Sequence, residues 1–448
     1  MLRVAVIGSG PSGVYTAQSL IQQQVVPDLE VHVLDRLPCP YGLVRYGVAP
    51  DHEKIKSLQN NLRAVLEHPA VHFLGNVRIG APGLEPADLL RGYHAVVYCV
   101  GAATDRRLGI PGEELPGSVS ATDFVSWYSA HPDAAGSGFA LGARSAVVIG
   151  VGNVAVDVAR ILGRGADELR GTDIPHAALD ALSGSRVADI HMVGRRGPSQ
   201  AKFTTKELRE LGALPSASVL LRADELSMDP DFTDPAGLPT ANRRNVEVLR
   251  GWAAVPPSDR PRRLHLRFFL RPVSVLGSEQ GVTGVRFERT RPDGRGGVVG
   301  TGRFEVVEAQ LVLRSVGYHG VPVPGLPFDA ERGTVPHAAG RVLRDGAPSP
   351  GEYVAGWIKR GPTGVIGTNR PCAKETAGSV LADAAALVGR ALSADPREVM
   401  RAAGQEPVEW PGWRGIEAAE AALGRELGRN SVKIPDWDGL LTAARTGG

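Results

Sequence analysis

Cysteine is scarce in this sequence. Only Cys39, Cys99 and Cys372 occur among 448 residues, and no two of them form a Cys-x-x-Cys pair. Zinc ribbons, protein-bound iron–sulfur clusters and redox-active disulfides need closely spaced cysteines, so the pattern argues against all three. We therefore expect no metal centre. The three thiols are expected to be small buried side chains in a protein of a reducing compartment, the cytoplasm.

Long apolar runs and an excess of one charge are also lacking. No stretch approaches the ~20 apolar residues that span a membrane, and the apolar start of the chain is too short for a signal peptide. The 50 Lys and Arg residues nearly balance the 48 Asp and Glu residues, which leaves a net charge of +2. We expect neither an integral membrane segment nor a nucleic-acid partner. The length predicts two or three domains with real cores.

Residues 4–14 read VAVIGSGPSGV and predict a buried strand, a glycine turn and a helix. The glycines of this G-x-G-x-x-G pattern are Gly8, Gly10 and Gly13. They permit a tight turn, close approach of a pyrophosphate and close packing of helix on strand. The next apolar run, 31–34, ends in Asp35, whose carboxylate can accept hydrogen bonds from a ribose hydroxyl. This order of elements predicts a dinucleotide site.

Residues 147–157, VVIGVGNVAVD, repeat the same turn with Gly150, Gly152 and Ala155. The following strand, expected at 187–193, ends in Gly-Arg-Arg-Gly instead of an acid. The guanidinium groups of Arg195 and Arg196 can grip a 2′-phosphate, which a carboxylate would repel. The second site is therefore predicted to bind NADPH and the first to bind FAD, although a simple solvated turn would also explain the two arginines.

At this point the sequence resembles the adrenodoxin reductase family of ferredoxin–NADP reductases. The resemblance is carried by GSGPSGVYTAQ (8–18), YGLVRYGVAPDH (41–52), IPGEELPG (110–117), GVGNVAVDVARIL (150–162), GRRGPSQAKFTTKELRE (194–210) and GWIKRGPTGVIGTN (356–369). It implies an α/β fold with two Rossmann-like dinucleotide-binding domains, as in the disulfide-reductase-like flavoproteins. The FAD-binding domain would be discontinuous, 1–105 and 319–448, and the NADPH-binding domain, 106–318, would be inserted into it.

The resemblance also implies roles for single residues. At FAD we expect Ser12 and Asp35 beside the adenosine half, Leu43 and Val77 in the pocket lining, and Trp357, Gly364, Val365 and Ile366 at the flavin ring. At NADPH we expect Gly150, Val151, Gly152, Asn153, Val154, Arg195, Arg196 and Glu207.

His52 and Glu207 are the candidate catalytic residues, placed by the resemblance at the flavin and at the nicotinamide. Simpler interpretations stay open. His52 follows Pro50 at a predicted helix start, where a histidine at the surface edge is common. Glu207 lies three residues after Thr204, so it could close a capping box. Trp357 could be an ordinary core aromatic.

The implied function is an FAD-containing NADPH:ferredoxin oxidoreductase, which passes hydride from NADPH to FAD and then single electrons to an acidic iron–sulfur ferredoxin. Two basic groups are candidate docking positions, although solvated faces explain such groups equally well: Lys202, Lys206 and Arg209, and Lys359 and Arg360. The alternatives are the electron-input subunit of a glutamate synthase-like complex, a flavin monooxygenase, and a dinucleotide-sensing protein without turnover.

Four further segments give weaker signals. The turn-rich stretch 226–263 predicts a loop excursion, and 288–300 predicts a hairpin with Asp293-Gly294 at its turn. A helix is expected over 373–388. The segment beyond about 390 is not assigned a role.

Overall fold

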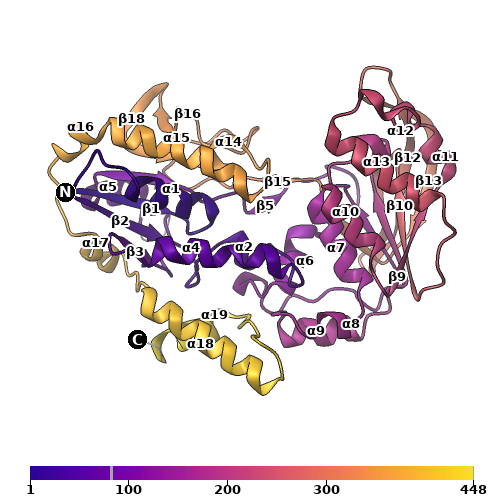
Figure 1. Ribbon diagram of the computed structural model, residues 1–448, viewed down its shortest axis with the longest axis horizontal. Helices are drawn as coiled ribbons and strands as arrows, with labels where there is room; N and C mark the ends of the chain where they lie inside the picture. The colour runs from indigo at the N-terminus through magenta and orange to yellow at the C-terminus, as the bar shows by residue number, and fades with distance from the viewer. Residues whose placement is uncertain (81–83, 447–448) are drawn as a thin grey trace. The chain divides into compact units, whose positions relative to one another are not determined.

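The computed structural model describes residues 1–80 and 84–446, and the chain forms two compact units (Figure 1). Unit 1 contains Met1–Val48, His52–Thr104 and Gly317–Gly448, and unit 2 contains Ala49–Asp51 and Asp105–Val316. The main part of unit 2, Asp105–Val316, begins and ends within two residues of the boundaries expected from the sequence, 106 and 318. The sequence did not indicate that residues 49–51 would also belong to unit 2. Asp51 explains this, because its carboxylate pairs with Arg160 and lies 2.7 Å from Nε of Arg164.

Unit 1 is built on a seven-stranded sheet. Its strand order is β16 (His337–Ala338), β17 (Arg341–Arg344), β18 (Ala347–Val354), β4 (Ala95–Tyr98), β1 (Leu2–Ile7), β2 (Leu29–Leu34) and β3 (Val71–Leu74). The five strands from β18 to β3 are parallel, so their carboxyl ends meet at one edge. Because both faces of these strands are covered, most of their residues are apolar.

Alternate residues of β1 supply the two cores of unit 1. Val4 and Val6 pack with α1 (Pro11–Ile21) and α15 (Asn369–Ala382), which run side by side (Figure 1). Ala5 and Ile7 belong to the core on the opposite face, which includes residues of α5 (Pro86–Gly92) and α17 (Pro396–Ala402). The helix expected at 373–388 is present as most of α15 and α16 (Ala384–Val388).

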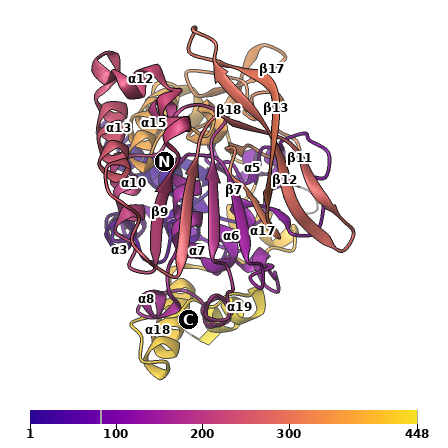
Figure 2. The same cartoon turned by 90° about the vertical axis from the view of Figure 1, so that its right-hand side faces the viewer.

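Unit 2 is built on a parallel six-stranded sheet (Figure 2). Its order is β6 (Ser118–Ser120), β14 (Leu311–Arg314), β7 (Ser145–Ile149), β8 (Asp189–Val193), β10 (Arg262–Arg267) and β9 (Ala217–Leu221). The strand expected at 187–193 is thus confirmed as β8, and the apolar run before Gly150 forms β7.

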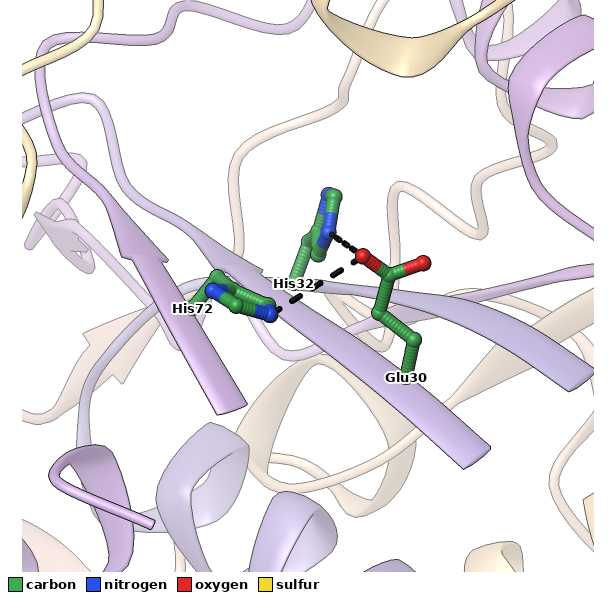
Figure 3. A group of neighbouring side chains, drawn as sticks. All are labelled: Glu30, His32 and His72. Atoms are coloured by element: carbon green, nitrogen blue, oxygen red, sulfur yellow. Dashed lines mark hydrogen bonds and ion pairs between the residues drawn. The ribbon is translucent and has the colours of Figure 1, made fainter. Parts of the chain in front are cut away.

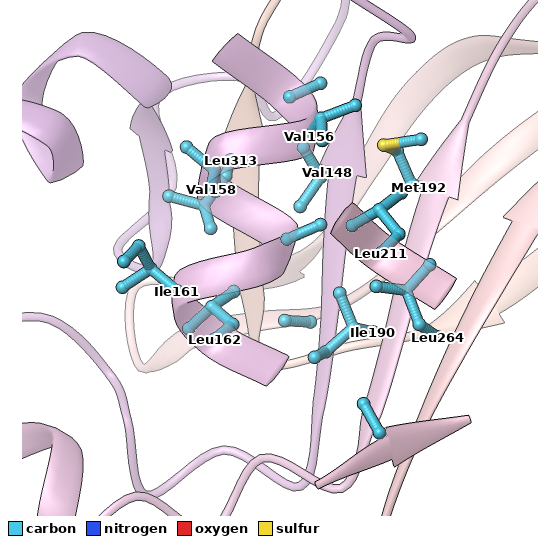
Figure 4. Packing of buried hydrophobic residues seen from close by; sticks show 14 of the residues in the cluster. Val148, Val156, Val158, Ile161, Leu162, Ile190, Met192, Leu211, Leu264 and Leu313 are labelled. Atoms are coloured by element: carbon cyan, nitrogen blue, oxygen red, sulfur yellow. The ribbon is translucent and has the colours of Figure 1, made fainter. Parts of the chain in front are cut away.

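The two faces of this sheet are covered differently. On one face pack α7 (Asn153–Gly163), α10 (Thr205–Gly212) and α13 (Thr240–Ala253), and Figure 4 shows Val156 of α7 beside Val148 of β7, and Leu162 facing Ile190 of β8. The other face is covered by an antiparallel sheet of β11 (Leu270–Ser278), β12 (Gly281–Pro292) and β13 (Val298–Glu308). Since β12 pairs with β13 around Asp293, the predicted hairpin is confirmed.

The predicted loop excursion at 226–263 is wrong, because the segment is largely helical. It contains the end of α11 (Ala223–Ser227) and all of α12 (Pro230–Thr233) and α13. The turn-forming residues are helix starts instead of loop residues. Asp229 caps α12 by accepting bonds from the N–H groups of Asp231 and Phe232, and Pro230 occupies the first helical position.

The C-terminal segment belongs to unit 1 and is held by a buried ion pair. Glu420 of α18 (Trp410–Glu426) accepts a 2.5 Å bond from the Arg45 guanidinium, which also lies 5.0 Å from the Trp413 ring. Lys433 Nζ donates to the Arg45 carbonyl oxygen at 2.6 Å. This links the tail to α2 (Leu43–Tyr46). Among the described helices, none combines the length and apolarity that a membrane crossing needs.

We predict that Glu420→Gln lowers the free energy of unfolding by about 3–5 kcal/mol, because it leaves the Arg45 charge buried without its counter-charge. The control is Glu426→Gln on the exposed end of the same helix, which should change stability by less than about 0.5 kcal/mol. Urea unfolding followed by tryptophan fluorescence measures both. Equal midpoints for the two variants would contradict a stabilising role for the pair.

Candidate dinucleotide sites

The first and third glycines of the unit 1 turn are required by packing. Gly8 has φ +108°, and a Cβ there would lie 2.5 Å from the Cys99 carbonyl oxygen. A Cβ on Gly13 would lie 1.8 Å from the Gly8 carbonyl oxygen. Both distances are impossible for a side chain, so these glycines bring the start of α1 directly onto the end of β1.

No contact among the described residues requires the middle glycine. A Cβ on Gly10 would meet only the Gly42 Cα within 4 Å, at an ordinary 3.8 Å. Gly10 caps α1 without a side-chain bond, and the first turn of this helix carries no acidic residue. The missing side chain therefore leaves an open backbone at a helix N-terminus, which is suited to a phosphate group.

Asp35 lies at the end of the neighbouring strand and is held by the same turn. Its Oδ2 accepts hydrogen bonds from the Ser9 N–H at 2.7 Å and the Ser9 hydroxyl at 2.5 Å, and its Oδ1 accepts one from the Leu37 N–H at 2.9 Å. Burial raises the pKa of this carboxyl group. Since a carboxylate has about four acceptor positions, one position remains for a ribose hydroxyl. Val77 is buried next to it and donates its N–H to the Asp35 carbonyl oxygen at 2.8 Å.

The segment before α2 closes against the glycine turn. Tyr41 and Gly42 both have positive φ, 83° and 49°, and a Cβ on Gly42 would lie 2.9 Å from the Gly10 Cα. Leu43 follows as the first residue of α2 and is 37% exposed. The turn thus has an apolar side chain next to its open backbone.

The segment after β18 reaches the start of α1. Gly356 has φ +79°, and a Cβ there would lie 2.4 Å from the Ser12 hydroxyl oxygen. Trp357 begins α14 (Trp357–Arg360), and its ring packs on Tyr318 with 5.2 Å between centroids. The Trp357 Nε1 atom is buried and has no hydrogen-bond partner within the described residues. Because buried N–H groups are normally paired, this atom fits a bound group with an acceptor.

The predicted flavin-ring turn leads into α15. Gly364 has φ +82°, Val365 is 59% exposed, and Ile366 begins the short helix η4 (Ile366–Thr368). Asn369 connects this turn to the others, because its Nδ2 donates to the Ile366 carbonyl oxygen at 3.0 Å and its Oδ1 lies near Gly356. The open backbone, the exposed Leu43 and Val365 and the unpaired Trp357 N–H together fit a dinucleotide with an aromatic ring system.

The turn of unit 2 has the same construction. A Cβ on Gly150 would lie 2.1 Å from the Ser315 carbonyl oxygen, whereas a Cβ on Gly152 would meet nothing within 4 Å. Gly152 caps α7, again without a side-chain bond, and Val154 lies in the first turn of that helix. The backbone is therefore open at a second helix N-terminus.

Residues 202–204 fold back onto this turn. The Val151 carbonyl oxygen accepts bonds from the N–H groups of Lys202 and Phe203 at 2.9 and 3.1 Å. Asn153 Oδ1 accepts the Thr204 N–H at 2.8 Å. These bonds fix the shape of the turn and explain the position of Asn153. From the sequence, only the family resemblance places Asn153 at NADPH.

Arg195 and Arg196 follow β8 with fixed backbones and free side chains. The Arg195 carbonyl oxygen accepts a hydrogen bond from the Thr290 hydroxyl at 2.8 Å. The Arg196 carbonyl oxygen accepts one from the Phe269 N–H at 3.2 Å. Neither guanidinium makes a hydrogen bond or ion pair with the rest of the described chain. A Cβ on Gly194 would lie 3.0 Å from Val151, so the pair stands beside the glycine turn. Two unpaired cations at this place fit a phosphate.

The two catalytic candidates are each buried, His52 in unit 1 and Glu207 in unit 2. His52 precedes the short helix α3 (Glu53–Lys56), as expected. Thr204 caps α10 by accepting the Glu207 N–H at 3.4 Å, but the Thr204 N–H donates to Asn153. The Glu207 carboxylate therefore does not close a reciprocal capping box by accepting the Thr204 N–H.

The two basic groups differ in exposure. Lys202, Lys206 and Arg209 are exposed, and the last two line a cavity of about 590 Å³ together with Arg244. Lys359 is only 5% exposed and donates to Glu375 and Thr376 at 2.9 and 3.0 Å. The expectation of Lys359 as a docking residue is therefore wrong, because α15 places two acceptors around its ammonium group.

Known proteins match the whole chain. Residues 2–196 match the family model of the pyridine nucleotide–disulphide oxidoreductases. NADPH-ferredoxin reductase FprA of Mycobacterium tuberculosis is 43% identical, with 98% of each chain covered. Mitochondrial NADPH:adrenodoxin oxidoreductase of Arabidopsis thaliana is 40% identical, with 99% of this chain and 95% of that protein covered. The solved structure of M. tuberculosis FprA in complex with NADPH has a TM-score of 0.92 at 42% identity and covers 99% of both chains.

These similarities extend over both units and include both glycine turns. They confirm the predicted α/β fold class and the predicted class of enzyme, an oxidoreductase. The chain belongs to the adrenodoxin reductase-like family of NADPH–ferredoxin reductases.

Proposed function

We propose that this protein is an NADPH:ferredoxin oxidoreductase that holds FAD in unit 1 and NADPH in unit 2. The observation that carries the proposal is the opposite charge beside two equivalent turns, a carboxylate at Asp35 and two unpaired guanidinium groups at Arg195 and Arg196. When bound, FAD accepts hydride from NADPH and releases electrons one at a time.

In unit 1, the open backbone at Gly10 and the N-terminus of α1 bind the pyrophosphate. Asp35 accepts a hydrogen bond from a ribose hydroxyl, and Ser12 lies in the first turn of α1. Leu43, Val77 and Val365 provide apolar surface for the rings. Trp357 donates its Nε1–H to the bound cofactor, and the backbone of Gly364 and Ile366 adjoins the flavin ring.

In unit 2, the backbone from Gly150 to Val154 binds the second pyrophosphate at the N-terminus of α7. Arg195 and Arg196 bind the 2′-phosphate, which separates NADPH from NADH. Glu207 is proposed to orient the nicotinamide, and His52 is proposed to adjoin the flavin.

The electron acceptor is proposed to be an acidic iron–sulfur ferredoxin. Three exposed cations of α10 and α13 line the 590 Å³ cavity against one carboxylate, Glu210, and offer a complementary surface: Lys206, Arg209 and Arg244. A cytoplasmic location is supported by the three free, buried cysteines, since thiols stay unpaired in reducing compartments.

We expect Arg195→Ala and Arg196→Ala each to raise KM for NADPH by about 10- to 100-fold, because each removes a charge-assisted bond to the 2′-phosphate. KM for NADH should change little. The control is Arg170→Ala, an exposed arginine at the C-terminal end of α8 (Ala166–Leu169) that pairs with Asp167 of the same helix. Steady-state kinetics with both nucleotides measure the preference, and an unchanged NADPH-to-NADH ratio would show that these arginines do not read the phosphate.

Replacement of Trp357 by Phe keeps an aromatic ring and removes the unpaired N–H. Loss of one hydrogen bond to the cofactor should raise the flavin dissociation constant by roughly 2- to 10-fold. Trp127→Phe in unit 2, where the indole packs on Phe124 and Phe139, is the matched control. The increase in flavin fluorescence on dilution gives the dissociation constant of each variant. Equal constants for Trp357→Phe and Trp127→Phe would argue against a hydrogen bond from Trp357 to the cofactor.

Ferredoxin-dependent reduction of cytochrome c by NADPH should fall as ionic strength rises past about 0.1 M, where the Debye length is about 10 Å. Lys206→Ala should weaken this salt dependence, whereas Arg303→Ala on exposed β13 should not. Flavin reduction without any transfer to ferredoxin would exclude the proposed activity. A salt-independent rate would exclude only the electrostatic docking.

A further inference from the structure

Three ionisable side chains that play no part in the proposed reaction gather on one face of the unit 1 sheet (Figure 3). Glu30 and His32 are two residues apart on β2, so both point to the same face. His72 lies on the neighbouring strand β3, directly opposite His32 in the register. This face is the one that carries Ala5 and Leu34, away from the core formed by α1 and α15.

The ligand atoms of this cluster converge on the oxygen of Glu30. His32 Nε2 lies 3.0 Å and His72 Nε2 3.8 Å from Glu30 Oε1, and all three ligand atoms lie within 4.8 Å of one another. Around a tetrahedral Zn²⁺ with bonds of about 2.0–2.1 Å, ligand atoms are roughly 3–4 Å apart. Small side-chain rotations are therefore enough to place one ion among them.

Outer partners already orient two of the three groups. The hydroxyl of buried Tyr93 lies 2.8 Å from His32 Nδ1, on the side of the ring away from the cluster. Arg3 Nε donates to Glu30 Oε2 at 2.7 Å and leaves Oε1 directed at the histidines. Without an ion, His32 Nε2 donates to Glu30 Oε1 at 3.0 Å, and binding a metal shifts the proton to Nδ1, where the Tyr93 hydroxyl accepts it and the Nε2 lone pair becomes available. His72 is 44% exposed, which gives an ion access from solvent.

We propose that Glu30, His32 and His72 bind one divalent transition-metal ion of the zinc class. Two imidazoles and one carboxylate suit Zn²⁺ in preference to Mg²⁺ or Ca²⁺, and three protein ligands leave one position for water. The ion joins β2 to β3, the outermost strand of the sheet order. Asp35 and the glycine turn stand at the carboxyl ends of the strands, beyond Leu34, so the ion clamps the sheet and takes no part in electron transfer.

This site differs from the sequence expectation of no metal centre. That expectation considers cysteine spacing, which excludes thiolate ligands and says nothing of histidine and glutamate on paired strands. The ligand pattern becomes visible only when the register places His72 opposite His32.

The test is a Zn²⁺ titration of the full-length, flavin-loaded, metal-free protein in competition with a chromophoric chelator. Wild type should bind one equivalent. His72→Ala should weaken binding by more than 100-fold, a larger loss than the roughly 10- to 100-fold expected for Tyr93→Phe, which removes only an outer partner. His68→Ala, an exposed histidine four residues from His72, is the matched control and should bind as wild type does.

Thermal unfolding gives a second readout. Zn²⁺ should raise Tm of wild type and His68→Ala but not of His72→Ala, because the ion binds only the folded sheet. NADPH–ferredoxin turnover should be the same in all three, so the outcome is independent of the proposed function. Absence of one-equivalent binding, or binding that survives His72→Ala, would overturn the proposal and leave an ordinary cluster of ion pairs.

Discussion

Close backbone packing at the first glycine of each turn is the constraint on which both candidate sites depend. In unit 1 a Cβ on Gly8 would collide with the Cys99 carbonyl oxygen, and in unit 2 a Cβ on Gly150 would collide with that of Ser315. Removing side chains at these points brings a helix N-terminus to the carboxyl end of a central parallel strand. The middle glycines, Gly10 and Gly152, have no such neighbours, so the backbone they expose is free for a ligand.

Specificity then depends on the end of the adjacent strand. Asp35 is oriented by Ser9 and Leu37, whereas Arg195 and Arg196 are fixed only through their backbones. An anchored acid matches a neutral ribose, and two free guanidinium groups match a phosphate. One supersecondary unit used twice can therefore bind two different dinucleotides, which is the arrangement that an electron-transfer flavoprotein requires.

The local parts of this architecture could be predicted from the sequence. The glycine turns, the strands beside them and the hairpin at Asp293 depend on neighbouring residues, and each is present. Contacts between distant residues could not be predicted. The Arg45–Glu420 pair spans 375 positions, and the acceptors that bury Lys359 come from another helix. The segment 226–263 was misassigned because Asp-Pro pairs start helices as readily as they form turns. The roles of His52, Glu207 and Trp357 still depend on the family resemblance and on burial.

An anaerobic titration of the purified protein with NADPH tests the central claim most directly. The account predicts a yellow protein whose flavin absorbance is bleached by about one equivalent of NADPH, and far more slowly by NADH. A colourless protein that cannot take up flavin, or a flavin that NADPH leaves oxidised, would contradict it.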